Sequence, residues 1–130
     1  MLLFVFVVCN FYNIHIPYQF STFNCHAPDI CSYGMKVLSD NGSGSDVDIV
    51  AAIDDVVQRH KANSGRKSVI SLSLGGSCFP NCQDDALVRA VEAARLDGVI
   101  SAVAAGNSNT NANSDSPAAA AGAITVGSTT

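Results

Sequence analysis

The chain has 130 residues, of which 48% are hydrophobic and 14% charged, and its formal net charge at pH 7 is -4. This length allows one domain with a modest core, and the hydrophobic content excludes a disordered chain. The seven Lys and Arg residues are scattered rather than clustered, so no nucleic-acid partner is expected.

The N-terminal segment, residues 1–26, carries no Asp, Glu, Lys or Arg and is left unassigned. Its apolar run at residues 2–9 is too short to span a bilayer, so no membrane span is expected. The run is a weak match to a secretory signal, because no basic residue precedes it and no small-x-small cleavage site follows closely. A wrongly chosen start, or translated non-coding sequence, is the alternative.

A first strand is expected at residues 33–38, followed by a turn at 39–44 whose residues tolerate a positive φ. Ser45 or Asp46 then caps a helix that ends near Asn63. Apolar residues recur in this helix at steps of three and four and form one stripe, made of Val47, Ile49, Val50, Ile53, Val56 and Val57.

A second strand is expected at residues 68–74, where a pair of glycines ends it. Asp84 and Asp85 mark the start of a second helix, because a helix N-terminus favours negative charge. Gly98 is the expected C-terminal stop of that helix. Its apolar stripe consists of Leu87, Val88, Val91 and Ala94.

The third strand, at residues 99–104, is a short continuous apolar run of the kind that is covered on both faces. Ala105, Gly106 and Asn107 follow it. The small residues allow a ligand to approach the backbone, and the Asn107 amide could donate to an oxygen that gains negative charge during acyl transfer. A plain Asn turn is the competing interpretation of this stretch by itself.

A polar loop at residues 108–116 leads to a fourth short strand at 123–126, so the predicted order of elements is β-α-β-α-β-β. Strands that alternate with helices predict the α/β class, with a parallel sheet and helices on both faces. In such sheets ligands bind at the carboxyl ends of the strands, which is where Asn107 stands.

Five cysteines, at positions 9, 25, 31, 78 and 82, leave one unpaired in any full pairing. Cys78 and Cys82 close a small polar loop, which favours a local disulfide over two free thiols and points to an oxidising compartment. How the other three pair is left open. A zinc site is disfavoured, because Cys25, His26 and Cys31 lack a second pair of ligands at finger or ribbon spacing.

Other chemistries have weaker support. Gly42 and Gly44 lie between a strand and a helix, as in a dinucleotide fingerprint, but Val47 occupies the place of the third glycine. A nucleotide-binding α/β domain is therefore a minor alternative. The sequence has neither a G-x-x-x-x-G-K-[ST] loop nor a G-x-S-x-G elbow.

Three segments stand out by their order and spacing: KVLSDNGSG at 36–44, SLSLGG at 71–76 and AVAAGN at 102–107. SPA at 116–118 and TVG at 125–127 follow them. Together these motifs resemble the subtilisin-like serine proteases, the proteinase K-like branch most of all. The resemblance covers residues 27–130 and implies a partial peptidase domain with the family's three-layer α/β sandwich.

The resemblance implies a role for each motif. Asn107 would be the oxyanion-hole donor, and Ala105 and Gly106 would form the wall of the pocket for the side chain that precedes the scissile bond. An extended polypeptide substrate would lie as an added strand between two backbone edges. These edges are Gly42, Ser43 and Gly44 on one side, and Ser73, Leu74 and Gly75 on the other.

The family's catalytic Asp, His and Ser are not found, because the sequence has no D-[ST]-G, H-G-T-H or G-T-S-M-A motif. We therefore expect a fragment of a secreted serine endopeptidase that is inactive by itself. No metal or cofactor is expected, and the family's calcium site would belong to a full-length chain. The alternative is a non-catalytic peptide-binding or decoy module with the same cleft.

Overall fold

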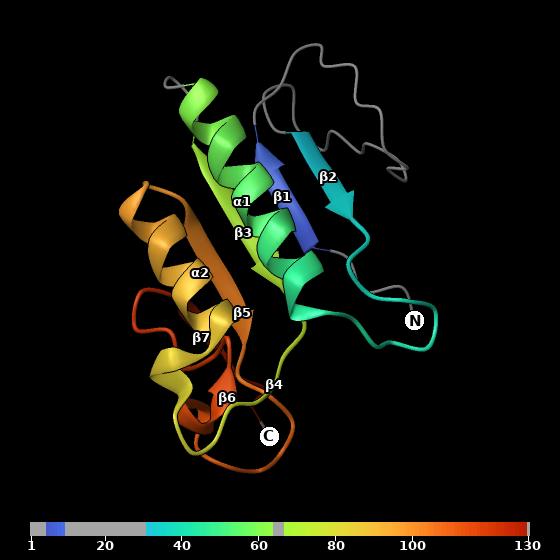
Figure 1. Cartoon of the computed structure of the whole chain (residues 1–130), viewed down its shortest axis with the longest axis vertical. Coiled ribbons are helices and arrows are strands. Elements are labelled where there is room, and N and C mark those ends of the chain that lie inside the picture. The colour runs from blue at the N-terminus through green and yellow to red at the C-terminus, as the bar shows by residue number, and fades with distance from the viewer. Residues whose placement is uncertain (1–4, 10–30, 64–66, 130) are drawn as a thin grey trace.

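The computed structural model describes residues 5–9, 31–63 and 67–129. Its larger sheet has five strands in the order β2-β1-β3-β5-β7 (Figure 1). These strands are β1 (Val5–Cys9), β2 (Cys31–Met35), β3 (Ser68–Leu72), β5 (Ile100–Ala104) and β7 (Ile124–Val126). A second, two-stranded sheet pairs β4 (Gly76–Ser77) with β6 (Asp115–Ser116).

The four large-sheet strands that the sequence predicts, β2, β3, β5 and β7, all run in the same direction. The first of them is displaced from its predicted range of residues 33–38, because β2 ends at Met35. β3 pairs in parallel with β5, and β5 pairs in parallel with β7. The exception is β1, which lies between β2 and β3 and is antiparallel to both, with Cys9 opposite Cys31. This strand comes from the unassigned segment 1–26; the rest of that segment, Cys25 and His26 included, lies outside the described residues.

The helices begin and end where the sequence predicts. α1 (Asp46–Ala62) is capped by Ser45, whose hydroxyl accepts the backbone N–H two residues further on, at 3.2 Å. α2 (Ala86–Leu96) is capped by the Asp85 carboxylate, which accepts two backbone N–H groups at 2.9 and 3.2 Å. Gly98 follows α2 with a φ of +87°, the left-handed conformation that ends a helix.

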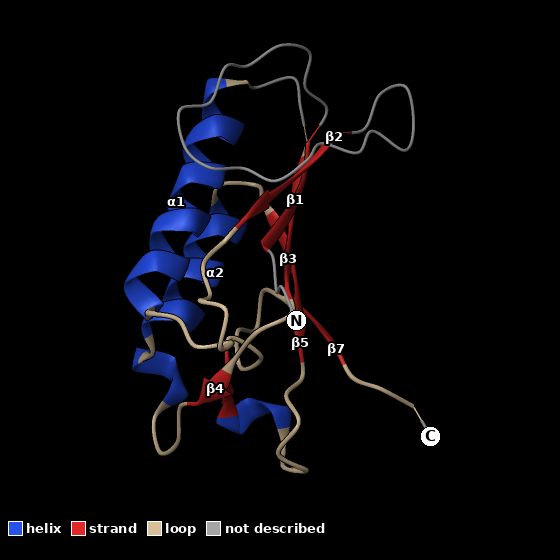
Figure 2. Cartoon of the chain, turned by 90° about the vertical axis from the view of Figure 1, so that its right-hand side faces the viewer, coloured by secondary structure: helices blue, strands red, loops and turns tan. Residues whose placement is uncertain are grey.

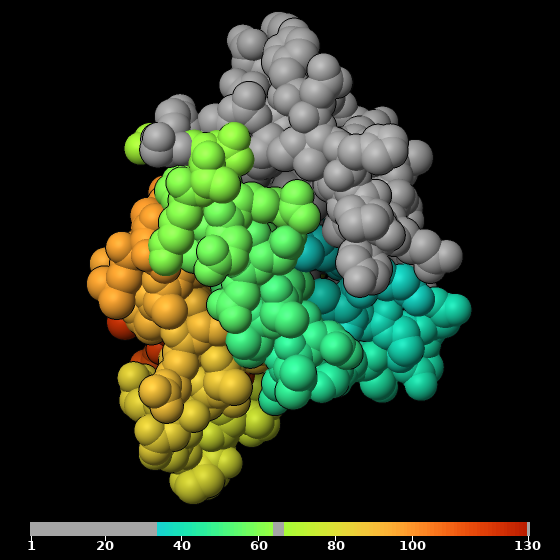
Figure 3. Space-filling model, turned by 45° about the horizontal axis from the view of Figure 1, so that its top comes forward, coloured from blue at the N-terminus to red at the C-terminus, as the bar shows by residue number. Residues whose placement is uncertain are grey.

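Both helices pack on the same face of the large sheet, as the side view shows (Figure 2). They lie side by side there, α1 in green and α2 in orange (Figure 3). The predicted α/β class with a parallel sheet is confirmed, but no helix among the described residues covers the opposite face. On that face Ile100, Ile124 and Val126 are 50%, 57% and 56% exposed.

The core lies between the two helices and the sheet. Side chains alternate across a strand, so β3 and β5 each turn every second residue toward the helices. The predicted stripe of α2 is buried in full, and the stripe of α1 is buried at Ile49, Ile53, Val56 and Val57. Two stripe residues differ, because Val50 is only partly buried and Val47 is exposed, and Ala52 is buried outside the predicted stripe. The largest fully buried apolar side chains are Ile53, Val56, Ile70, Leu72, Val88, Val91, Val99, Val103 and Pro117.

Replacing Ile53, which is 0% exposed, tests this core. We expect Ile53→Ala to lower the free energy of unfolding by about 2–5 kcal/mol, because it removes buried methyl groups and leaves a cavity. Urea denaturation followed by circular dichroism measures the loss. Val47→Ala on the same helix is the control: that side chain is 74% exposed, and its truncation should change stability by no more than about 0.5 kcal/mol. Equal losses in the two variants would contradict the assigned core.

Candidate functional site

A cavity of about 780 Å³ opens where β3 and β5 end. Parallel strands bring their carboxyl ends to one edge of a sheet, so the segments that follow them meet there. The lining comes from the loop before α1, the segment after β3, the segment after β5, the starts of both helices, and β6. It includes eight of the nine predicted substrate and oxyanion residues: Gly42, Ser43, Gly44, Ser73, Leu74, Gly75, Gly106 and Asn107.

The loop before α1 is held in shape by its own hydrogen bonds. The Ser43 carbonyl accepts the Ser39 N–H at 2.8 Å and the Ser39 hydroxyl at 2.6 Å, and the Gly42 N–H donates to the Ser39 carbonyl at 2.9 Å. Gly44 forms a β-bridge with Leu38. Among the described residues nothing donates to the Gly42 carbonyl. The loop therefore lines the cavity in a preformed conformation and keeps one main-chain acceptor free.

The segment after β3 has the opposite character, because its main chain is unpaired. Ser73, Leu74 and Gly75 make no backbone hydrogen bond to another described residue. A Cβ at Gly75 would lie 2.5 Å from the Ser116 carbonyl oxygen, so a side chain there would push β6 away. Unpaired N–H and C=O groups on an extended segment are a template for an added strand.

Asn107 lies at the end of the third lining segment, after Gly106. Its side chain is exposed, and its carboxamide makes no hydrogen bond to a described residue, so both amide N–H groups can donate into the cavity. Ala105 is the predicted site residue that does not line the cavity. Its N–H donates to the Val126 carbonyl at 3.0 Å and so continues the β5–β7 ladder.

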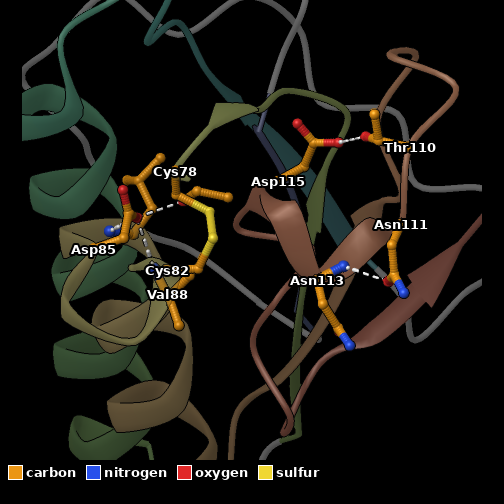
Figure 4. The surroundings of a disulfide bond; sticks show 10 residues. Cys78, Cys82, Asp85, Val88, Thr110, Asn111, Asn113 and Asp115 are labelled. Carbon is orange, nitrogen blue, oxygen red and sulfur yellow. Dashed lines mark hydrogen bonds between the residues drawn. A yellow bond between two sulfur atoms is a disulfide. The ribbon is translucent and has the colours of Figure 1, made fainter. Parts of the chain in front are cut away.

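The predicted disulfide is confirmed: Cys78 and Cys82 are bonded, with their Cα atoms 4.8 Å apart (Figure 4). It closes the loop between β4 and α2. Asp85, which follows this loop, accepts a hydrogen bond from the Ser116 hydroxyl in addition to capping α2. This hydrogen bond joins β6 to the start of α2. The two residues are 31 positions apart in the sequence, so no local sequence pattern predicts the contact.

The charged residues that line the cavity are four aspartates, Asp40, Asp46, Asp85 and Asp115. Of these four, Asp40 is the one with an ion pair among the described residues, because Lys36 Nζ lies 2.6 Å from its Oδ1. The hydrogen bond from Lys36 and its positive charge lower the pKa of the Asp40 carboxyl below its ordinary value of 3.8. Sequence reasoning assigned no functional role to any of these four carboxylates.

Metal and membrane sites have no support in the described ranges. Within residues 5–9, 31–63 and 67–129 no three His, Cys, Asp or Glu side chains come together as metal ligands. Neither α1 nor α2 has both the length and the apolar character that a bilayer crossing requires.

The chain is similar to known proteins both in sequence and in fold. The family model described as "Subtilase family" matches residues 15–130. The chain belongs to the subtilase family. It is 43% identical over 104 residues to alkaline serine exoprotease A of Vibrio alginolyticus, covering 80% of this chain and 18% of that protein. It is 37% identical over 104 residues to the extracellular serine proteinase of a Thermus species, covering 80% and 23%.

A solved structure of the same family has a similar fold. The crystal structure of a cold adapted subtilisin-like serine proteinase aligns with a TM-score of 0.60 at 37% identity, over 73% of this chain and 32% of that one. The subtilase chain spans about a fifth to a quarter of the length of the curated relatives that it matches. Members of this family are serine endopeptidases.

The Lys36–Asp40 pair makes a pH-dependent prediction. In Lys36→Met the pKa of Asp40 should rise toward 3.8, because the hydrogen bond and the positive charge that lower it are gone. A folded-state pKa below the unfolded value stabilises the protein above that pH range, and the contribution is lost as the pH falls through it. The variant should therefore lose stability at neutral pH but not in acid. Titration of the Asp40 carboxyl by NMR measures the shift.

The matched control is Lys61→Met, which removes an equal charge from the pair with Asp97 at 2.9 Å. It should leave the Asp40 titration where it is. An Asp40 pKa that moves equally in both variants would reduce the effect to net charge and contradict the local pairing.

Proposed function

We infer that this chain is the part of a subtilisin-like serine endopeptidase that binds extended polypeptide and supplies the oxyanion-hole donor. One observation carries the proposal: two backbone edges and the unbonded carboxamide of Asn107 line a single cavity. The edges are Gly42–Gly44, with a free carbonyl at Gly42, and Ser73–Gly75, with no backbone partner in the described residues.

A substrate strand between these edges is recognised mainly through its main chain. Each added N–H···O=C bond contributes about 0.5–1.5 kcal/mol net, and every residue of the substrate offers the same two groups. The unpaired segment at Ser73–Gly75 supports this mode, since its donors and acceptors are otherwise exposed without partners. Such binding fixes the direction of the peptide and its position along the cavity, and leaves the choice of sequence to side-chain contacts.

Asn107 acts on charge that appears during the reaction. When a carbonyl carbon of the substrate becomes tetrahedral, its oxygen carries a negative charge, and an amide N–H held beside it stabilises that state more than the ground state. Removal of one such donor from subtilisin, a member of this family, lowers turnover by about 10²- to 10³-fold. The exposed, unbonded amide of Asn107 is suited to the role.

The 130 residues are proposed to bind without hydrolysing. They contain none of the three triad motifs, so they supply neither a nucleophile nor a general base for proteolysis. The same fact favours the second candidate, a non-catalytic peptide-binding module. Secretion is part of the proposal: one relative is named an extracellular proteinase, and the Cys78–Cys82 disulfide suits an oxidising compartment.

A pair of ligands separates strand binding from oxyanion binding. One is an extended amide peptide, and the other is the same peptide with a phosphinic group in place of one amide, which gives a permanent tetrahedral anion. Asn107→Ala should weaken the phosphinic peptide by roughly 10- to 100-fold, the value of a hydrogen bond to a charged acceptor, and leave the amide peptide unchanged. Isothermal titration calorimetry measures both dissociation constants.

Asn109→Gly is the matched control, because Asn109 is another exposed amide on the same loop and its φ of +52° suits glycine. Both ligands should bind this variant as they bind the original chain. No binding of either ligand to the original chain would overturn the proposed function. Equal loss of both ligands in Asn107→Ala would remove the oxyanion role and leave peptide binding in place.

A further inference from the structure

One carboxylate in the cavity has no positive partner. Asp115 is 6% exposed, yet it lines the cavity. Its side chain makes one hydrogen bond in the described part of the chain, in which Thr110 Oγ1 donates to Oδ2 at 3.5 Å, and no ion pair (Figure 4). A buried charge without a counter-charge is costly, so this carboxylate is poised to take a cation.

The other three cavity aspartates are already stabilised. Asp40 is paired with Lys36 at 2.6 Å. Asp85 accepts two N–H groups at the start of α2 and the Ser116 hydroxyl. Asp46 is exposed in the first turn of α1, where water and the helix dipole stabilise it. Asp115 has none of these, and no Lys or Arg of the described residues lines the cavity.

The Asp115 carboxylate packs against the backbone of Gly106, next to the proposed oxyanion donor Asn107. A Cβ at Gly106 would lie 2.7 Å from Asp115 Oδ2, and the φ of Gly106 is +93°. Glycine is therefore required twice, by conformation and by close approach. Gly106 directly precedes Asn107, so the Asp115 carboxylate lies beside the residue next to the oxyanion donor.

We propose that Asp115 sets the specificity of this cavity for a lysine or arginine side chain at the residue that precedes the scissile bond. The inference rests on the proposed function and adds the substrate class to it. The long aliphatic part of either side chain fits a cavity lined by Leu74, Leu87 and Ala104, and the terminal cation pairs with Asp115. The pairing supplies the positive charge that the chain itself does not provide at Asp115.

The test uses two phosphinic peptides that differ only in the residue before the phosphorus. One has lysine there and the other has norleucine, which keeps the aliphatic chain but lacks the charge. The phosphinic oxyanion at Asn107 holds both in one register. On the 130-residue chain the lysine peptide should bind at least about tenfold more tightly, and Asp115→Asn should bring the ratio near one without weakening the norleucine peptide.

Two variants separate charge at Asp115 from other effects. Asp54→Asn removes an equal charge from an exposed position of α1 outside the cavity and should preserve the lysine preference. Thr110→Val removes the hydrogen bond to Asp115 but keeps the carboxylate, and should preserve it as well. A preference lost in Thr110→Val would overturn the inference in favour of a structural role for Asp115.

Equal affinity for the two peptides on the original chain would overturn the inference whatever the variants do, including the case in which Asp115→Asn does not fold. An unchanged ratio in folded Asp115→Asn would overturn it too. Failure of both peptides to bind the original chain would instead contradict the proposed function, so the two failures are distinguishable.

Discussion

The cavity depends on the parallel pairing of β3 with β5. Their register puts Leu72 opposite Val103, so both strands leave the sheet at the same level. The unpaired segment Ser73–Gly75 and the segment that carries Gly106 and Asn107 consequently start side by side. A shift of one residue would reverse which side chains face the helices and would bury Val69 and Ser71 in place of Ile70 and Leu72. Burial of the core side chains therefore fixes the register of β3 against β5. This register in turn fixes the relative positions of the segments that line the cavity.

A second set of contacts forms the part of the cavity wall that β4 and β6 contribute. β4 continues the segment after β3 and pairs with β6, and the disulfide fixes the loop that leads on to α2. Asp85 joins these parts, because its carboxylate both caps α2 and accepts the Ser116 hydroxyl. One side chain thus links helix, loop and strand, and Gly75 allows β6 to come close. Through β6 this arrangement positions Asp115.

The sequence predicts those features of the structure that depend on residues close together in the chain. It does not predict the contacts between residues that are far apart in the chain. The α2 stripe, most of the α1 stripe, the Ser45 and Asp85 caps, the Gly98 stop and the Cys78–Cys82 bridge are found as predicted, because each rests on a spacing within one helix or loop. β1 was not predicted, because an apolar run is also typical of a signal segment and its strand partners lie far away in sequence. The β4–β6 pairing and the Asp115 contact with Gly106 are non-local and leave no periodic trace. The apolar run at 99–104 favours two covered faces, but the described helices cover one.

The electrostatics of the cavity set a condition on catalysis in the proposed enzyme. An oxyanion hole stabilises negative charge, yet four carboxylates line the same cavity and oppose it. Lys36 offsets Asp40, the α2 dipole offsets Asp85, and solvent screens Asp46, which leaves the buried Asp115 as the main opposing charge. A lysine or arginine of the substrate would offset that charge as the peptide binds. Part of the stabilisation of the oxyanion beside Asn107 would then come from the substrate, so the side chain that selects the bond would also favour its reaction.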